Sequence, residues 1–281
     1  MLGDDFMSDC NSCSSKDGCN KDKSSCMIEN NPLNNVKKII GVMSGKGGVG
    51  KSSISVTIAK HLKGLGYSVG ILDADVTGPS VPRLLGVANK KATTSESMLN
   101  PVETNDGIKV MSLNFLMENE EDPVIWRGPA ISGMVKQFWT DVLWGELDYL
   151  VIDMPPGTGD VALTVLQSIP ISGVVMISVP QDLVSMIVAK AVNMAKKMNI
   201  NILGIIENMS YITCTKCGEK MKLFNGDNTE KFLNDMDLKL LGELPMLSSI
   251  NNLGKSDDAH IDESLELLFD PIVKKIIDEL E

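Results

Sequence analysis

The residues with the most specific chemistry form a glycine-rich run between residues 45 and 52. The run fits the pattern G-x-x-x-x-G-K-[ST], in which backbone N–H groups curl around phosphate oxygens. Lys51 is expected to reach the β- and γ-phosphates of a nucleotide, and Ser52 to bind Mg²⁺. The alternative is a tight turn without a ligand, which the predicted strand–loop–helix context disfavours. The expected cofactor contacts here are Gly45, Lys46, Gly47, Gly48, Val49, Gly50, Lys51, Ser52 and Ser53.

Charged side chains around this loop extend the predicted site. Asp153 ends an apolar strand, where a carboxylate holds the hydration shell of Mg²⁺. Asp73 and Asp75 end another strand and are candidates for orienting the attacking water. Lys46 is a second lysine inside the loop, placed either to add positive charge to the γ-phosphate or to lie solvated on the surface. Lys46, Lys51 and Asp75 are the predicted catalytic residues.

Two cysteines, Cys214 and Cys217, follow a predicted strand and precede Gly218. Thiolates at this spacing grip one metal centre together, but they fill only half of a tetrahedral zinc site or a four-cysteine cluster site. A symmetric dimer would supply the other pair. The spacing leaves three alternatives open, namely an iron–sulfur cluster, a structural zinc ion shared by two such pairs, and a redox pair.

A second group of cysteines lies in the polar first 35 residues, which are rich in Ser, Asn, Asp and Lys. This composition buries too little apolar surface to fold by itself, so we expect either disorder or organisation by a metal. Four cysteines in such a segment suggest a ferredoxin-like cluster site, and the alternative is a flexible tail that binds metal weakly. They are Cys10, Cys13, Cys19 and Cys26.

Apolar segments alternate with helical ones from residue 37 onward. Continuous apolar strands followed by helices indicate a doubly wound, mostly parallel α/β sheet covered on both faces, of the P-loop NTPase type. Ligands of such sheets bind beyond the carboxyl ends of the strands, where the motifs above lie. We expect a cysteine-rich tail over 1–35 and a P-loop ATPase domain over 36–281. Strands are predicted at 39–43, 69–72, 149–152, 173–178, 202–206 and 238–244, and helices at 51–65, 183–198 and 263–281.

The composition disfavours several classes of function. The chain has 281 residues, 43% of them hydrophobic, and a formal net charge of −11. Non-specific nucleic-acid binding depends on many Lys/Arg–phosphate contacts, which an acidic chain disfavours. No apolar run reaches the roughly 18 residues that span a bilayer, and the first residues lack a basic, then apolar, signal peptide. We therefore expect a cytoplasmic protein without nucleic-acid or membrane partners, whose reduced thiols are free to bind metal.

These motifs together resemble the Mrp (ApbC-like) family of iron–sulfur cluster carrier ATPases, a family in the deviant-P-loop class of dimeric ATPases. The resemblance covers about residues 37–250. It implies a protein that binds and hydrolyses ATP, receives a cluster from an assembly scaffold, and passes it to apo iron–sulfur proteins. It rests on six segments, Gly45–Ser52, Asp73–Ser80, Trp126–Pro129, Asp153–Asp160, Glu207–Ser210 and Cys214–Cys217.

The resemblance also implies roles for single residues. Lys46 would contact nucleotide across the interface of a homodimer, and Asp75 would position the attacking water. Asn208 and the region of Pro245 would lie near the adenine. The C-x-x-C thiolates of two subunits would bridge one [4Fe–4S] cluster. The tail departs from relatives that carry one, because their fourth cysteine precedes the C-x₂-C-x₅-C pattern, whereas here Cys26 follows it.

Related classes of ATPase are the alternatives. A spatial-positioning ATPase of the MinD/ParA kind needs a basic surface or a cationic amphipathic helix, but the predicted helix over 263–281 has only two lysines against several acids. A dimeric regulatory ATPase stapled by zinc would use the same C-x-x-C thiolates. An ATP-driven electron donor resembling nitrogenase reductase uses widely separated single cysteines, which the C-x-x-C pair does not match.

Overall fold

The computed structural model of the chain describes residues 31–76, 78–95, 98–117, 128–180, 186–214, 216–222, 229–246 and 263–281. The tail predicted over 1–35 lies outside these ranges except for residues 31–35, and all four of its cysteines lie outside them as well. Within the described ranges, no helix is long and apolar enough to cross a membrane.

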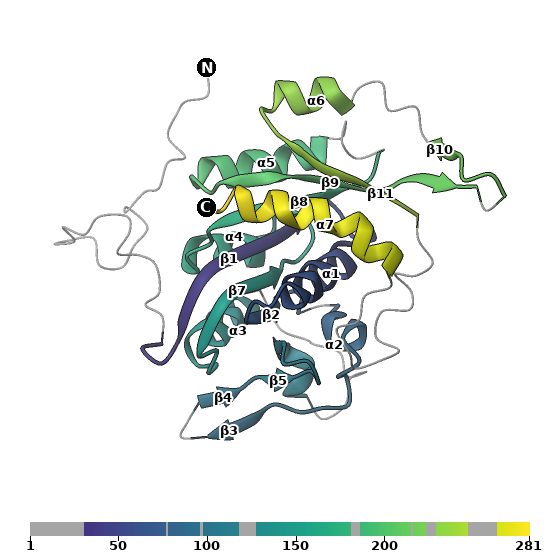
Figure 1. Cartoon of the computed structure of the whole chain (residues 1–281). Coiled ribbons are helices and arrows are strands. Elements are labelled where there is room, and N and C mark those ends of the chain that lie inside the picture. Colours follow the sequence, from purple (N-terminus) through teal and green to yellow (C-terminus); the bar gives the residue numbers. More distant parts are fainter. Residues whose placement is uncertain are drawn as a thin grey trace, which may run out of the picture.

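The described strands form one large sheet and one small hairpin sheet (Figure 1). The small sheet pairs β3 (Thr93–Ser95) with β4 (Met98–Asn100). The large sheet contains β1 (Asn35–Ser44), β2 (Val69–Asp73), β5 (Val102–Glu103), β6 (Lys109–Met111), β7 (Glu146–Asp153), β8 (Gly173–Ser178), β9 (Ile202–Thr213), β10 (Lys220–Lys222) and β11 (Leu240–Pro245). Its order is β10-β9-β8-β1-β7-β2-β6-β5, with β11 also paired to β9.

Most of the large sheet is parallel. β1 lies between β7 and β8 and is parallel to both. β2 is parallel to β7 and β6, and β9 is parallel to β8 and β11. Antiparallel pairs occur only at the two ends of the described sheet, between β5 and β6 and between β9 and β10. The apolar run of β1 is buried from Ile39 to Ser44, as a strand covered on both faces requires. The predicted doubly wound, mostly parallel sheet is confirmed.

Helices cover both faces of this sheet (Figure 1). The described α-helices are α1 (Lys51–Gly64), α2 (Val81–Leu84), α3 (Gly128–Thr140), α4 (Asp160–Ser168), α5 (Met186–Lys197), α6 (Thr229–Asp235) and α7 (Glu263–Asp278). α1 and α7 pack together on one face, whereas α3 and α4 pack together on the other face, which α5 also covers. α7 lies within the helix predicted over 263–281 and buries Leu265, Phe269 and Ile276, so it packs against the domain.

The parallel arrangement brings the ends of three strands together. Asp73 at the end of β2 is the register partner of Asp153 at the end of β7. Asp153 is in turn the register partner of Val42 in β1, two residues before that strand ends at Ser44. The residues that follow these strands therefore share one edge of the sheet, which is where ligands bind in such folds.

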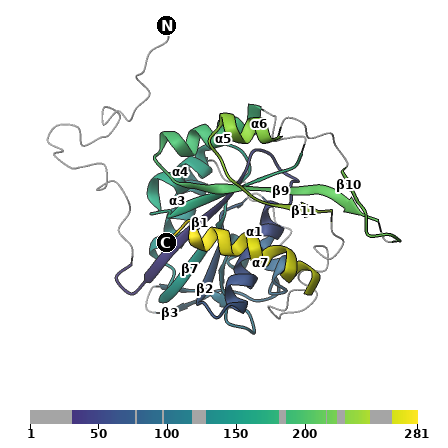
Figure 2. The same ribbon diagram turned by 45° about the horizontal axis from the view of Figure 1, so that its top comes forward.

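β9 differs from its neighbours in length and reach. It extends beyond the body of the sheet toward β10, as both views show (Figure 2). The hairpin that joins β9 to β10 contains Cys214 and Cys217. The cysteine pair thus lies beyond the body of the sheet, but it directly follows a strand that belongs to the sheet.

A polar contact near the amino ends of β1, β2 and β7 fixes their stagger. The Asp148 carboxylate accepts hydrogen bonds from Lys37 Nζ and from the backbone N–H and hydroxyl of Ser68, each at 2.8 Å. These contacts lower the pKa of Asp148 from its ordinary value to about 2, and the Lys37 hydrogen bond contributes most.

This depressed pKa predicts a pH dependence of stability. A carboxyl group with a lowered folded pKa stabilises the fold above its unfolded pKa and loses that contribution as the pH falls through the folded value. The Asp148 contribution should therefore disappear between about pH 4 and pH 2. We expect urea midpoints to fall less steeply over that window in Asp148→Asn than in the unmodified protein. Parallel curves for the two proteins would contradict the assignment.

Candidate functional site

The glycine-rich run forms an open loop between β1 and α1. Gly48 and Gly50 have φ angles of 81° and 84°, in the left-handed region that only glycine adopts without strain. A Cβ atom placed on Gly47 or Gly48 would meet nothing within 4 Å, so the backbone there is accessible. α1 has 14 residues and begins directly after Gly50. Accessible amides at the N-terminus of a helix make a site suited to an anion such as phosphate.

The most buried charges of the site form an ion pair between the P-loop and β7. Asp153 is fully buried, and Lys51 exposes 6% of its side chain. The carboxylate of Asp153 accepts hydrogen bonds from Lys51 Nζ at 2.7 Å, Ser52 Oγ at 2.6 Å and Ser55 Oγ at 2.8 Å. A buried charge is tolerated only when it is paired and hydrogen-bonded, so these contacts account for the presence of Asp153 inside the sheet.

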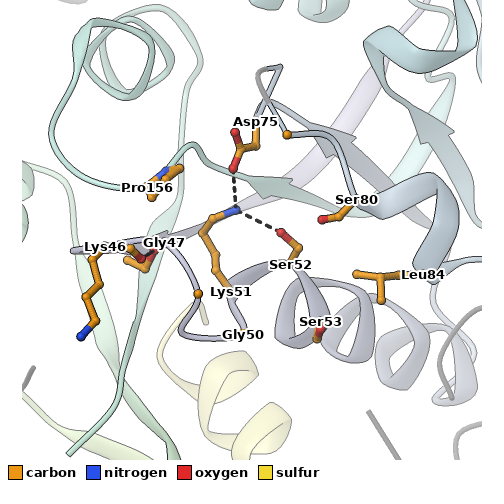
Figure 3. Close-up of a pocket in the computed structure, with 13 residues that line it drawn as sticks. Lys46, Gly47, Gly50, Lys51, Ser52, Ser53, Asp75, Ser80, Leu84 and Pro156 are labelled. Atoms are coloured by element: carbon orange, nitrogen blue, oxygen red, sulfur yellow. Dashed lines mark hydrogen bonds and ion pairs between the residues drawn. The ribbon is translucent and has the colours of Figure 1, made fainter. Parts of the chain in front are cut away.

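Asp75 faces this pair from the loop after β2. Its Oδ2 lies 3.8 Å from Lys51 Nζ, and its side chain is 15% exposed. Figure 3 shows the Lys51 ammonium between Asp75 and Ser52. The pocket in front of them has a volume of about 340 Å³. Its lining residues are Ser44, Lys46, Gly47, Gly48, Gly50, Lys51, Ser52, Ser53, Asp75, Gly78, Ser80, Leu84 and Pro156.

Eight of the predicted site residues line this pocket, and others lie behind it. Asp153 does not line it, because Lys51 and Ser52 cover the carboxylate. The remaining predicted contacts that do not line it are Gly45, Val49, Asp73, Asn208 and Pro245. The eight predicted residues that line the pocket are Lys46, Gly47, Gly48, Gly50, Lys51, Ser52, Ser53 and Asp75.

Asp73 supports the loop that carries Asp75. Asp73 Oδ1 accepts a hydrogen bond from the Asp75 N–H at 3.2 Å, and Oδ2 accepts bonds from the Val81 N–H and the Ser112 hydroxyl, both at 3.3 Å. Burial raises the pKa of Asp73 well above its ordinary range, and the nearby charge of Asp153 raises it further. Asp73 therefore influences the pocket indirectly, because its hydrogen bonds hold the backbone of Asp75 and the start of α2.

Lys46 lies on the outer side of the P-loop. Its side chain is exposed, and in Figure 3 it points away from Lys51 and from the interior of the pocket. Its backbone carbonyl accepts a hydrogen bond from the Ser44 hydroxyl at 2.9 Å. The next loop packs beside this segment, since the Gly157 N–H donates to the Ser44 carbonyl at 2.8 Å. The ammonium of Lys46 is thus presented outward by a loop that is held on both sides.

Asn208 packs directly on the back of the P-loop. Its Nδ2 donates to the Val49 carbonyl at 2.9 Å, and the residue is 1% exposed. A Cβ atom on Gly50 would approach this nitrogen to 2.4 Å, so glycine is required at position 50 for this contact as well as for its φ angle. Pro245 lies at the end of β11, opposite Tyr211 of β9.

The cysteine pair occupies the tight turn between β9 and β10. Cys214 donates its N–H to the Glu219 carbonyl and accepts from the Gly218 N–H, both at 2.9 Å. The pKa of Cys214 is lowered by the backbone N–H of Cys217, then by that of Lys216, and by the Cys217 thiol. Cys214 is half-buried and Cys217 is exposed. A thiol stabilised as thiolate beside an exposed second thiol suits metal ligation.

This pair is incomplete as a metal centre. No group of three or more His, Cys, Asp or Glu side chains that could hold a metal ion occurs in the described part of the chain. The C-x-x-C turn therefore offers two thiolates, as its spacing predicted, and a tetrahedral centre needs two more ligands.

Several site residues were not predicted from the sequence. Ser55 lies one helical turn after Lys51, and that i to i+4 spacing was the available signal for a second hydroxyl near Asp153. Ser80 and Leu84 flank the start and end of the short helix α2. Ser44 and Pro156 line the pocket from the ends of neighbouring segments. Nothing local in the sequence marks Leu84 as a pocket residue.

Comparison with known families decides which group of P-loop proteins this is. A family model described as ParA, the NUBPL iron-transfer P-loop NTPases, matches residues 35–281. The chain belongs to this family. The match spans the described α/β fold, from the first residue of β1 to the last residue of the sequence, and it confirms the predicted resemblance to Mrp-type proteins.

Other members of the NUBPL family are similar over most of their length. An iron–sulfur cluster carrier protein of Clostridium perfringens is 48% identical over 254 residues, covering 85% of this chain and 89% of the relative. A protein of the same name from Methanocaldococcus jannaschii is 41% identical and covers 97% of this chain and 96% of the relative. The mouse iron–sulfur cluster transfer protein NUBPL is 43% identical over 221 residues, or 78% of this chain and 69% of the relative.

Solved structures agree with this family assignment. A nucleotide-binding protein from Archaeoglobus fulgidus, solved with ADP and with Co found in it, has a TM-score of 0.70 and 41% identity. The alignment covers 82% of this chain and 89% of that protein. MinD in the MinC:MinD complex of Aquifex aeolicus has a TM-score of 0.62 at 17% identity, over 86% of this chain and 96% of MinD. The second likeness shows a shared fold alone.

The buried pair at the P-loop makes a prediction about stability. Lys51→Ala leaves Asp153 buried with two hydroxyl donors and no cation, so the free energy of unfolding should fall by about 3–5 kcal/mol. The double variant Lys51→Ala/Asp153→Asn removes the uncompensated charge and should recover most of that loss. Urea unfolding followed by circular dichroism measures both.

A surface pair supplies the control for this experiment. Lys37 and Asp148 form an ion pair of similar length, 2.8 Å, but the Lys37 side chain is 64% exposed. Lys37→Ala should change the urea midpoint far less than Lys51→Ala, because water screens the exposed pair. Equal losses of stability in Lys37→Ala and Lys51→Ala, or no recovery of stability in the double variant, would contradict the prediction. Burial of Asp153 would then not determine how much stability is lost.

Proposed function

We propose that this protein binds Mg-ATP and hydrolyses it slowly, and that it carries an iron–sulfur cluster to apoproteins. The observation that carries the proposal is the presence, on one chain, of a phosphate pocket backed by Lys51, Ser52 and Asp153 and of a separate, exposed dithiol hairpin at Cys214 and Cys217. The names of the relatives support the cargo, since several are iron–sulfur cluster carrier or transfer proteins.

The nucleotide phosphates would bind at the open backbone of Gly47 and Gly48 and at the start of α1. Their negative charge draws Lys51 away from Asp153 and toward the β- and γ-phosphates. Asp153 and the Ser52 hydroxyl then offer hard oxygen donors, only 2.6 Å apart in this structure, which fit the preference of Mg²⁺ for oxygen ligands. When bound, Mg²⁺ supplies charge neutralisation to the phosphates.

Asp75 is the residue we assign to the attacking water. It lines the pocket and lies beside Lys51, on the side where the γ-phosphate would lie. Asp73 is a positioning residue, because its carboxylate holds the Asp75 backbone. Water attacks the γ-phosphorus, the bond to the ADP oxygen breaks, and the carboxylate of Asp75 orients the water and accepts its proton.

Lys46 and the cysteines both support a homodimer as the working form. The outward direction of the exposed Lys46 suits contact with the nucleotide of a second copy. Two thiolates per chain, in the absence of a third ligand among the described residues, suit a [4Fe–4S] cluster shared by two copies. The shared cluster is cargo, received from an assembly scaffold and passed to an apo acceptor.

Asn208 and Pro245 are proposed as adenine contacts. Asn208 Oδ1 is buried and has no hydrogen-bond partner among the described residues. An amide oxygen of this kind accepts from the exocyclic amine of adenine, whereas guanine has a carbonyl at that position. ATP should therefore bind in preference to GTP. The cytoplasm is the proposed compartment, because exposed thiols stay reduced there.

Hydrolysis is tested with a substitution outside the buried pair. Asp75→Asn should lower kcat for ATP by about 10²–10⁴-fold, the usual contribution of general acid–base catalysis, while ATP binding persists. Asp235→Asn changes an exposed carboxylate at the end of α6, outside the pocket lining, and should leave kcat unchanged. Phosphate release and calorimetric ATP binding measure the two properties. Full turnover in Asp75→Asn, with ATP bound, would remove Asp75 from the mechanism.

The cargo is tested by anaerobic reconstitution of a chain whose tail cysteines are replaced by serine. We expect about four iron ions and four sulfides for every two chains, sedimentation as a dimer, and transfer to an apo acceptor. Cys214→Ser and Cys217→Ser should each lose the cluster and the dimer. One zinc ion per two chains without sulfide would instead identify a zinc-stapled regulatory ATPase. A loaded monomer would refute the shared site.

A further inference from the structure

β9 is continuous along the chain, but its pairing partners divide it into two segments. Its ladder with β8 ends at Glu207, and its ladder with β10 begins at Tyr211. On the other edge, β11 pairs with the same two residues and shifts register between them. Residues 208–210 thus connect a segment anchored in the sheet to a segment that carries the cysteine hairpin.

The backbone of this connection is bent and then fixed by a buried contact. Met209 has a φ of 54°, a left-handed conformation that is strained for a side chain of this size. The Ser210 hydroxyl donates to Glu207 Oε2 at 2.7 Å, and both residues are at least 97% buried. The hydrogen bond spans Met209 and so links the two segments of β9.

The same connection touches the P-loop at the peptide group between Val49 and Gly50. Asn208 Nδ2 donates to the Val49 carbonyl at 2.9 Å. No described peptide bond is cis, and the N–H of a trans peptide points opposite to its carbonyl. The Gly50 N–H therefore points away from Asn208, and Gly50 itself lines the pocket.

Phosphate in the pocket acts on this peptide group from its other side. An anion that accepts from the Gly50 N–H polarises the peptide and strengthens the hydrogen bond that its carbonyl accepts from Asn208. The peptide plane also becomes fixed in one orientation. The hydrogen bond from Asn208 therefore acts on the bend in β9 with a different strength in the anion-bound and the anion-free protein.

We propose that residues 207–211, which we name the β9 joint, couple nucleotide at the P-loop to the position of the Cys214–Cys217 hairpin. Cys214 lies six residues beyond Asn208, about 20 Å along an extended strand. Beyond the joint, β9 pairs with β10 and, at Tyr211, with the end of β11. A rotation at Met209 would therefore carry β10 and the hairpin together and would shift the pairing of Tyr211 with Pro245. Asn208 and Ser210 are positioning residues in this device. The proposal rests on the proposed nucleotide and thiol sites.

Coupling of this kind has a reciprocal consequence. If nucleotide changes the hairpin's equilibrium position, occupation of the thiols changes nucleotide affinity by the same factor. Coupling factors between distinct sites are commonly about 5–150-fold.

The test follows the two thiols in metal-free protein, so that cluster chemistry does not enter. Anaerobic alkylation of Cys214 and Cys217 is timed by mass spectrometry with and without Mg²⁺ and a non-hydrolysable ATP analogue, whose binding is measured separately by calorimetry. In the unmodified protein, the analogue should change the alkylation rate of at least one of the two thiols by about fivefold or more.

Variants of the joint decide whether the effect passes through it. Met209→Gly relaxes the bend and Ser210→Ala removes its hydrogen bond, so each should reduce the nucleotide effect to less than about twofold by weakening the coupling. Ser210→Thr keeps the hydroxyl and should restore the effect. Ser132→Ala, which removes the hydroxyl contact with Thr164 at 3.0 Å between α3 and α4, should leave it intact.

The outcomes separate this proposal from the proposed function. Bound analogue with unchanged thiol rates in the unmodified protein overturns the joint and leaves the ATPase assignment standing. A full effect in both Met209→Gly and Ser210→Ala overturns the joint and points to subunit contact as the route. Absence of analogue binding contradicts the nucleotide site itself.

Discussion

The buried pair between Lys51 and Asp153 is the contact on which the site depends. An ammonium and a carboxylate at 2.7 Å inside the sheet compensate each other, and neither can leave without a replacement charge. A magnesium–phosphate ligand brings both replacements at once, since anionic oxygens receive the lysine while a cation faces the carboxylate. The proposed binding step would thus exchange one neutral arrangement for another. Free phosphate without a cation would leave Asp153 uncompensated, so the pair would favour the metal-bound nucleotide.

Much of the fold and the centre of the site could be predicted from the sequence. The signals for them are either contiguous motifs or apolar patterns that repeat from strand to strand. The glycine pattern at 45–52 is contiguous, and short apolar runs mark the buried cores of β1, β2, β7 and β8. Parallel pairing then brings the strand-terminal carboxylates Asp73 and Asp153 into register without further information. The prediction of a phosphate site needed only these two facts, and eight of the predicted residues line one pocket in the structure.

Other features depend on contacts between distant segments and carry no local signal. Asn208 and Val49 are 159 residues apart, and nothing near either residue announces their hydrogen bond. The two-residue strand β5 and the β3–β4 hairpin are too short for a periodic pattern. Helix α5 (Met186–Lys197) falls within the predicted range of 183–198, of which residues 183–185 lie outside the described part of the chain. The left-handed Met209 departs from the preference of such positions for glycine or asparagine, so no local signal predicts its conformation.

The position of the cysteine pair follows from what a carrier must do. A metal centre enclosed by one chain needs all its ligands from that chain and is shielded from any acceptor. A two-thiolate turn at the tip of a strand is the opposite arrangement, since Cys217 is exposed and the described part of the chain holds no group of three or more metal ligands. If a flexible loop joined this turn to the sheet, a structural change at the nucleotide site would not reach the cysteines. Here it continues a strand whose Asn208 touches the P-loop backbone. The proposed cluster site and the proposed nucleotide site would thus lie apart in space but be joined by a few covalently linked residues.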